Sequence, residues 1–356
     1  MGLGEGMQKY CISVVIPVYN CEKYIHRCLK SLSSQNFEGK FEIIIVDDGS
    51  IDNTVDGCST IISNMNIPYQ LIKQPNLGAS AARNAGIRAA KGEYLIFVDG
   101  DDALEPNALR TLYELATIDQ AEMAYGCFKK VDESGKLLWL YRPGKKYVGQ
   151  WSSYELVDAI LKGKMLIRLG SFIITKRCLL DHGIYFHEGC KYGEDMEFII
   201  KCLLNINQVY GTGAFIYNYF ENIGSVMNKV GFERFEFVEA LKRLESHLLK
   251  GKNKDRELLE ALFQFFIPYG ILYHIDELLV KKIPVNEIIS FLSSKNYDIL
   301  LQAACFSDIN ASVAWKARLW KDKPEAYGKR IYASRKIKLL IHKKFPIMSL
   351  IKCIRL

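Results

Sequence analysis

The sequence predicts an α/β protein, a sheet flanked by helices, followed by a helical C-terminal region. Apolar, β-branched runs at residues 11–19, 41–50, 69–74 and 94–98 are typical of strands. Segments with helical periodicity separate these runs, and strands that alternate with helices form parallel sheets with right-handed crossovers. Residues 231–308 then carry apolar stripes at helical spacing, most simply explained by core packing.

Each element of the first hundred residues has a local cause. "CISVVIPVY" is a continuous apolar run, and Asn20 after it can cap the next helix. "FEIIIVDDGS" breaks at Gly49, and Asp52 can open a second helix. "YQLIKQ" is a short third strand. "GASAARNAGIRAAKG" is a helix of small residues that ends at Gly92, before the fourth strand "YLIFV".

The elements that follow are a hairpin, a strand and three helices. Residues 123–143 predict a β-hairpin closed near "DESGK". Ser152 and Glu155 form a capping box for the next helix. "SFIITKRCLL" predicts a strand that leads into a short helix, and Glu194 and Asp195 open a further helix.

Polar loops follow three of the four strands. "PVYN" ends the first strand, "DDGS" the second, and the fourth runs into Asp99, Asp101 and Asp102. Ligands of parallel sheets bind at the carboxyl ends of the strands, where these loops would meet. Like charges about 4 Å apart repel by ~1 kcal/mol in water and ~4 kcal/mol at a dielectric near 20, so a bound cation would stabilise the turn. The alternative is a simple acidic turn, with Asp102 as the N-cap of the next helix and Pro106 in its first turn.

The loop after the first strand excludes two common ways of binding a nucleotide. A dinucleotide site would need G-x-G-x-x-G where the sequence has "PVYN", and a Walker loop is absent as well. A metal is then the natural means of holding a diphosphate, because Mg²⁺ and Mn²⁺ prefer carboxylate and phosphate oxygens.

Five motifs together resemble glycosyltransferase family 2. They are "SVVIPVYN", "IIIVDDGSIDNT", "NLGASAARNAGI", "GEYLIFVDGDD" and "GEDMEF", in family order within residues 11–220. The resemblance implies the GT-A fold, a Rossmann-like mixed sheet flanked by helices. It also implies inverting transfer of a sugar from a nucleotide-diphosphate sugar, with Mn²⁺ or Mg²⁺ as cofactor and UDP as the nucleotide by family habit.

The resemblance gives donor-binding roles to the first two loops. Tyr19 matches the aromatic residue that packs on the nucleobase; the alternative is a tyrosine in the core. Pro17 and Val18 would shape that pocket through their backbone. Asp47 and Asp48 match an acidic pair of which one accepts a hydrogen bond from the base. Asp48 is favoured and Asp47 stays open, while outside the family context "DDGS" would be only a turn.

Arg83 and the D-x-D sequence complete the donor side. Arg83 matches an arginine that faces the nucleotide, and the alternative is an exposed helix face. Asp99 and Asp101, with Gly100 between them, match the family's D-x-D. Asp101 would ligate the metal, and Asp99 would contact the ribose or the metal and its water shell. The metal would stabilise the charge on the leaving diphosphate.

On the acceptor side, Asp195 resembles the general base of an inverting transferase, and Glu194 would position the acceptor or the base. General base catalysis contributes about 10²–10⁴-fold. Without the resemblance, acids in a first helical turn are usually dipole and capping residues.

These motifs predict a non-processive hexosyltransferase that moves one sugar to a hydroxyl of a glycan or lipid-linked acceptor in cell-surface polysaccharide synthesis. The Q-x-x-R-W motif of processive polymerases is absent. Two alternatives remain. A nucleotidyltransferase would want a glycine- and lysine-rich loop after the first strand. A non-catalytic nucleotide-sugar or glycan-binding module would be expected to lose the D-x-D or the base.

The domain prediction is a flexible N-terminus at 1–10, a GT-A catalytic domain at 11–225, a helical extension at 226–311 and a basic amphipathic tail at 312–356. The tail holds 13 Lys or Arg and two acids. We expect its residues 329–356, which Pro346 should divide into two short segments, to lie on an anionic membrane face, because basic amphipathic segments bind there. The alternatives are packing on the catalytic domain and nonspecific nucleic-acid binding, and we expect no nucleic-acid partner.

The cellular setting follows from absences in the sequence. Ten scattered cysteines without a CxxC pair favour reduced thiols. No signal core, uninterrupted membrane-spanning run or myristoylation pattern occurs. We therefore expect a cytoplasmic protein, peripheral on the inner membrane face, and the sequence leaves a homo-oligomer open.

Overall fold

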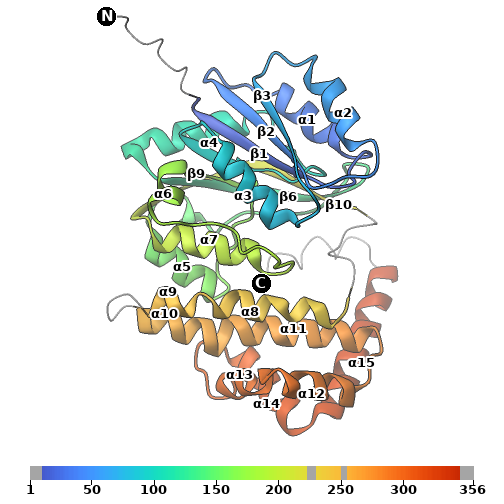
Figure 1. The fold of residues 1–356 in the computed structure, drawn as a ribbon. Helices are drawn as coiled ribbons and strands as arrows, with labels where there is room; N and C mark the ends of the chain where they lie inside the picture. Colours follow the sequence, from blue (N-terminus) through green and yellow to red (C-terminus); the bar gives the residue numbers. More distant parts are fainter. Residues whose placement is uncertain (1–9, 223–229, 250–254, 345–356) are drawn as a thin grey trace, which may run out of the picture. The chain divides into compact units, whose positions relative to one another are not determined.

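The computed structural model describes residues 10–222, 230–249 and 255–344, which divide into two compact units. Unit 1 takes in Met1–Tyr154 and Ile167–Asn222, and unit 2 takes in Glu155–Leu166 and Ile223–Leu356. In Figure 1 the chain runs from blue in unit 1 to red in unit 2.

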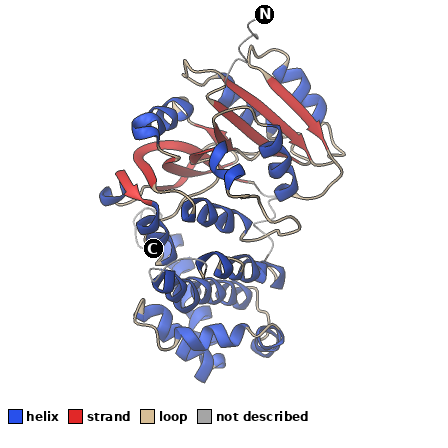
Figure 2. Cartoon of the chain, turned by 60° about the vertical axis from the view of Figure 1, so that its left-hand side comes forward, coloured by secondary structure: helices blue, strands red, loops and turns tan. Residues whose placement is uncertain are grey.

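Unit 1 is built on one mixed sheet of ten strands. Its order is β3-β2-β1-β4-β9-β6-β10-β5, with β7 paired to β6 and β8 to β10. The strands are β1 (Ile12–Val18), β2 (Phe41–Asp47), β3 (Tyr69–Lys73), β4 (Tyr94–Phe97), β5 (Ala103–Leu104), β6 (Met123–Asp132), β7 (Leu137–Tyr141), β8 (Gly149–Ser152), β9 (Phe172–Thr175) and β10 (Gln208–Glu221). Figure 2 shows these strands in red.

The pairing follows the predicted alternation of strand and helix. β1 is parallel to β2 and β4, and β2 is parallel to β3. β9 then runs antiparallel to both β4 and β6, which makes the sheet mixed. The predicted hairpin is confirmed, because β6 and β7 pair antiparallel around a turn at residues 133–136.

Helices cover this sheet. They are α1 (Ile25–Ser33), α2 (Thr54–Ile62), α3 (Ala79–Ala89), α4 (Ala108–Thr117), α6 (Lys176–Asp181) and α7 (Glu194–Leu204), while α5 (Ser153–Leu161) runs across the boundary of the two units. The small residues of α3 let it approach β1 closely. A Cβ atom added at Gly86 would lie 2.2 Å from Cγ1 of Val15, so only glycine fits there.

The prediction that Asn20 caps the first helix is wrong. α1 begins at Ile25, and Asn20 lies in the left-handed region at φ 48°. Its Oδ1 accepts a hydrogen bond from the backbone N–H of Ile51 at 2.9 Å, and its own N–H donates to Oγ of Ser50 at 3.0 Å. Asparagine tolerates this conformation, and here it ties the loop after β1 to the loop after β2.

The described part of unit 2 consists of helices joined by turns and loops. Its helices are α8 (Glu236–Lys242), α9 (Glu245–Leu248), α10 (Asp255–Ala261), α11 (Ile267–Val280), α12 (Val285–Ser294), α13 (Tyr297–Ala304), α14 (Ala311–Asp322) and α15 (Pro324–Lys344). α11 packs against α13, α14 and α15. Asp276 of α11 joins Lys316 of α14 at 2.9 Å and accepts from the Tyr327 hydroxyl of α15 at 2.6 Å. The apolar stripes of this region are core packing, as expected.

One helical stretch, Arg256–Val280, is long and apolar enough to cross a membrane by length and composition. Half of its most apolar window is buried inside the structure, and helices at the core of a folded domain pass the same test. The N-terminus to residue 9 and the end of the basic tail, with Pro346, lie outside the described residues. The nine cysteines within the described part of the chain are all free thiols.

Candidate active site

The carboxyl ends of β1, β2 and β4 bring three predicted loops to one edge of the sheet. β1 ends at Val18, β2 at Asp47 and β4 at Phe97, and all three strands point the same way. Asp48 donates its backbone N–H to the carbonyl of Val18 at 2.9 Å, so the first two loops are in direct contact.

Tyr19 stands at the end of β1 with 48% of its surface exposed. The alternative of a tyrosine in the core is therefore wrong. Pro17 and Val18 belong to the fully buried strand below it. An exposed aromatic ring on a rigid strand end is available for stacking against a planar group.

Asp47 and Asp48 are both buried but have different partners. Oδ1 of Asp48 accepts from the side-chain amide of Gln74 at 2.7 Å and from the N–H of Leu77 at 2.8 Å, and its Oδ2 accepts from the N–H of Gly78 at 2.8 Å. Oδ1 of Asp47 accepts from the N–H of Ser50 at 3.1 Å within its own turn. Asp48 thus fixes the loop that leads into α3.

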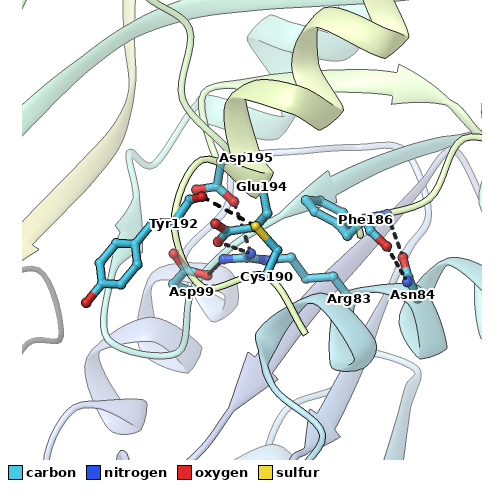
Figure 3. Close-up of polar contacts among 8 residues, drawn as sticks. All are labelled: Arg83, Asn84, Asp99, Phe186, Cys190, Tyr192, Glu194 and Asp195. Atoms are coloured by element: carbon cyan, nitrogen blue, oxygen red, sulfur yellow. Dashed lines mark hydrogen bonds and ion pairs between the residues drawn. The ribbon is translucent and has the colours of Figure 1, made fainter. Parts of the chain in front are cut away.

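Arg83 is the centre of the site. From α3 its guanidinium reaches Oδ1 of Asp99 at 2.9 Å, Oδ1 of Asp195 at 3.0 Å and Oε1 of Glu194 at 3.5 Å. Figure 3 shows these three carboxylates converging on it from the D-x-D turn and from the start of α7. The Arg83 side chain is only 5% exposed, so the alternative of an exposed helix face is wrong.

This cluster holds more negative than positive charge. Burial and then the neighbouring charge of Asp195 raise the pKa of Glu194 to about 8, although Arg83 opposes both effects. Burial also raises the pKa of Asp195, and Arg83 again opposes the shift. A pKa of about 8 means that Glu194, whose side chain is 14% exposed, is protonated near neutral pH.

The D-x-D turn is held from two sides. Asp101 accepts from the side-chain amide of Asn222 at 2.7 Å, and its backbone carbonyl accepts from Arg27 of α1. A Cβ atom on Gly100 would lie 2.9 Å from Cγ1 of Val18, so glycine allows the turn to approach β1. The three D-x-D residues therefore lie directly beside the loop that carries Tyr19.

The prediction that Asp102 caps the next helix is wrong. α4 begins only at Ala108, and Asp102 is buried beneath the turn. Its carboxyl accepts from the hydroxyl of Tyr217 and from the N–H of Phe220 at 2.7 Å, which fixes the turn to β10. Burial raises the pKa of Asp102 well above its ordinary value, and Asp101 and Asp99 raise it further.

Asp99 and Asp101 suit a divalent cation that brings most of its own ligands. Asp99 uses Oδ1 for Arg83 and Asp101 uses Oδ2 for Asn222, so each carboxylate retains a second oxygen. Burial and the charge of Asp99 raise the pKa of Asp101, a repulsion that a cation would relieve. Within the described ranges no three acidic, histidine or cysteine side chains form a metal cage. Mg²⁺ or Mn²⁺ held by one or two carboxylates, substrate phosphates and water needs none.

Sequence reasoning missed the residues that support this site. Asn84 donates to the carbonyl of Phe186 at 2.9 Å and accepts from its N–H at 2.9 Å (Figure 3). It also donates to Glu188 at 3.0 Å. The contact spans 102 residues, and the sequence offers no signal for it beyond a polar side chain in a helix of small residues. Asn222, Tyr217 and Arg27 were missed for the same reason.

Comparison with known proteins gives a family, relatives and folds. Residues 13–183 match the family model described as Glycosyl transferase family 2. The chain is 29% identical over 220 residues to Glycosyltransferase GlyG of Streptococcus pneumoniae, covering 61% of this chain and 72% of GlyG. It is 27% identical over 261 residues to poly(ribitol-phosphate) beta-N-acetylglucosaminyltransferase TarS of Staphylococcus aureus, covering 71% of this chain but only 44% of TarS.

Two solved structures share the fold. The crystal structure of S. aureus TarS 1-349 in complex with UDP-GlcNAc matches with a TM-score of 0.67 at 20% identity, over 92% of both chains. Mannosyltransferase PcManGT from Pyrobaculum calidifontis, in complex with GDP-Man and Mn2+, matches with a TM-score of 0.53 at 16% identity, over 96% of this chain and 89% of that one. These likenesses confirm the predicted GT-A fold with its helical C-terminal region.

Proposed function

We propose that this chain, which belongs to glycosyl transferase family 2, is an inverting, metal-dependent enzyme that moves one sugar from a UDP-sugar to a hydroxyl of a glycan or lipid-linked acceptor. The activity that the name of TarS gives supports a polyol-phosphate polymer such as poly(ribitol phosphate) as the acceptor. The single observation that carries the proposal is the bridge by Arg83 between Asp99 of the D-x-D turn and Asp195 of α7. It places a donor-binding acid and a candidate base in one cluster.

The donor side of this proposal uses the strand-end loops. Tyr19 offers an exposed ring for the nucleobase, and Asp48 or Asp47 supplies a carboxylate beside it. Asp101, with Asp99, would hold Mn²⁺ or Mg²⁺. When bound, the cation would stabilise the negative charge that develops on the leaving diphosphate.

The acceptor side uses the first turn of α7. Glu194 keeps its proton near neutral pH, whereas Asp195 is 45% exposed and pairs with the Arg83 guanidinium, which favours its charged form. We assign Asp195 as the base. It takes the proton of the acceptor hydroxyl while that oxygen forms a bond to C1 of the sugar, and the bond from C1 to the diphosphate oxygen breaks on the opposite face. Glu194, protonated, can donate a hydrogen bond that positions the acceptor.

The proposal includes contact of the described part of the tail with an anionic membrane. On α14, Trp315 is 42% exposed, and the guanidinium of Arg330 on α15 lies 4.4 Å from its ring centroid. Phe306 is 79% exposed, and Arg318 donates to the carbonyl of the adjacent Cys305 at 2.6 Å. Exposed aromatic rings beside basic side chains suit the interface of an anionic bilayer.

The test is a panel of nucleotide sugars incubated with the full chain and Mn²⁺, read by release of nucleoside diphosphate. We expect turnover of at least one UDP-sugar, faster with a polyol-phosphate or glycan acceptor present. The Asp195→Asn variant should still bind UDP, but it should form UDP from the UDP-sugar far more slowly than the wild type. A wild-type chain that binds no nucleoside diphosphate in the presence of Mn²⁺ would overturn the proposal.

A further inference from the structure

Arg168 opens a short loop that is built against the D-x-D turn. Its carbonyl accepts from Oγ of Ser171 at 2.8 Å, and its N–H donates to the same oxygen at 3.2 Å. Gly170 has a φ of +65°, and a Cβ atom there would lie 2.3 Å from the ring of Tyr217. The hydroxyl of Tyr217 donates to Asp102. One tyrosine therefore connects this loop to the acidic turn.

The guanidinium of Arg168 rests on aromatic rings. It lies 4.5 Å from the centroid of Tyr219 and 5.5 Å from that of Phe128. Such contacts hold a guanidinium in place through its face and leave its edge of N–H donors available. The side chain is thus positioned before any ligand arrives.

No carboxylate of the described residues pairs with the N–H donors of Arg168. Throughout the described parts of the chain, no carboxylate lies within ion-pair distance of its guanidinium. Its Nε is buried without a hydrogen-bond partner there. A buried donor that is left unsatisfied destabilises the folded state, so an unpaired arginine in this position favours an external acceptor.

The positive charge of Arg168 lowers the pKa of Asp195, the candidate base. Burial raises the pKa of Asp195, and the positive charges of Arg83 and then Arg168 lower it. Arg83 already binds three carboxylates, but Arg168 binds none. Of the two arginines that act on Asp195, only Arg168 is free to bind a substrate anion.

We propose that Arg168 binds a phosphate group of the sugar acceptor and so presents the adjacent hydroxyl to Asp195. This inference rests on the proposed function and names the acceptor class as a phosphate-containing polyol or glycan. A planar guanidinium fork matches the oxygens of a phosphate in two parallel hydrogen bonds. The donor diphosphate is assigned to Asp99, Asp101 and their cation, whereas the acceptor is the substrate that must reach the base.

The experiment is a calorimetric titration of the full chain, saturated with UDP and Mn²⁺, using ribitol 5-phosphate as the probe and ribitol as its phosphate-free match. We expect the phosphate probe to bind at least tenfold more tightly than ribitol. Arg168→Gln should remove this preference, with a loss of about 10- to 100-fold in affinity for the phosphate probe. Arg168→Lys should recover only part of it, because an ammonium lacks the planar fork.

Arg142, which directly follows β7, gives a matched control, since its guanidinium also lies over an aromatic ring, 4.6 Å from the centroid of Phe215. Arg142→Gln should leave the phosphate preference intact. UDP affinity, measured in the same samples, separates the two proposals: no UDP binding by the wild type contradicts the proposed function. UDP binding with equal affinity for ribitol and its phosphate overturns the role of Arg168. Competition between UDP and the phosphate probe overturns it too, because Arg168 would then serve the donor.

Discussion

Arg83 and Asp195 lie 112 positions apart in the sequence, yet Nη1 of the arginine is 3.0 Å from Oδ1 of the aspartate. The same guanidinium uses Nη2 for Asp99, so one side chain from α3 links the D-x-D turn to the start of α7. The pairing explains how a buried arginine and two nearby acids remain stable together, and it determines what substitutions there should do.

Replacing Arg83 should damage both stability and activity. Arg83→Ala leaves Asp99, Glu194 and Asp195 without their shared cation, and removing one partner from a buried ion pair typically costs about 3–5 kcal/mol. We expect a lower thermal midpoint and loss of UDP release. Arg88→Ala, on the exposed side of the same helix, should change stability by less than about 0.5 kcal/mol. Equal midpoints for the two variants would contradict the bridging role.

Asp195→Asn should separate binding from chemistry. The amide keeps the size of the side chain but cannot accept a proton, so kcat should fall by about 10² or more. The Kd for UDP, measured with Mn²⁺, should change little because Tyr19 and Asp101 are untouched. Glu194→Gln mimics the protonated glutamic acid and should retain much more activity. If the glutamine variant is the inactive one and the asparagine variant turns over, the roles of the two acids are reversed.

Asp101→Ala should abolish the metal dependence of donor binding. This carboxylate retains an oxygen for a cation while the other oxygen is held by Asn222. UDP should bind the variant equally weakly with Mn²⁺ and with excess chelator, as measured by calorimetry. Asp56→Asn on the exposed face of α2 is a control of the same charge change. Wild-type activity that persists in excess chelator would remove the metal from the mechanism.

Glu194 should make the protein less stable as pH rises. Its pKa in the folded state is about 8, against an ordinary value of 4.5. The folded state therefore holds a proton that the unfolded state releases, and the stability present below about pH 4.5 is lost as pH rises towards 8. Glu194→Gln should flatten the fall of the thermal midpoint across that window. A midpoint profile parallel to that of the wild type would show that the proton resides elsewhere.

The tail can be tested with charge reversals in its described part. Lys329→Glu with Arg330→Glu should reduce sedimentation of the full chain with anionic liposomes, because each basic residue near the surface contributes about 1 kcal/mol. Lys145→Glu with Lys146→Glu makes the same charge change on unit 1 and should have little effect. If both double variants lose liposome binding equally, the binding depends on the net charge of the protein and not on the tail. If the wild-type chain does not sediment with anionic liposomes at low salt, the membrane proposal is wrong.

Local patterns predicted most of the sheet and the positions of the loops. The apolar runs and the alternation of strand and helix identified β1 to β4, and the rule of strand ends grouped Tyr19, Asp48 and Asp99 in one place. What local patterns lacked was the identity of long-range partners. Asn20 and Asp102 both looked like helix caps, but one pairs across two loops and the other is buried beneath Tyr217. A short polar side chain can cap a helix or form a hydrogen bond with a distant part of the chain, and tertiary packing decides which of the two occurs.

The cluster around Arg83 couples binding of the donor to the ionisation of the acids on the acceptor side. Asp99 helps to raise the pKa of Glu194, and a cation arriving with the nucleotide at the D-x-D turn would offset that negative charge. Occupation of the donor site should then lower the pKa of Glu194 from about 8, so that nucleotide binding releases a fraction of a proton to solvent while most Glu194 side chains stay protonated at neutral pH. Proton release would appear as a binding enthalpy that depends on the ionisation enthalpy of the buffer. By linkage, nucleotide affinity would rise with pH, so the donor itself would adjust the ionisation of the acids that meet the second substrate.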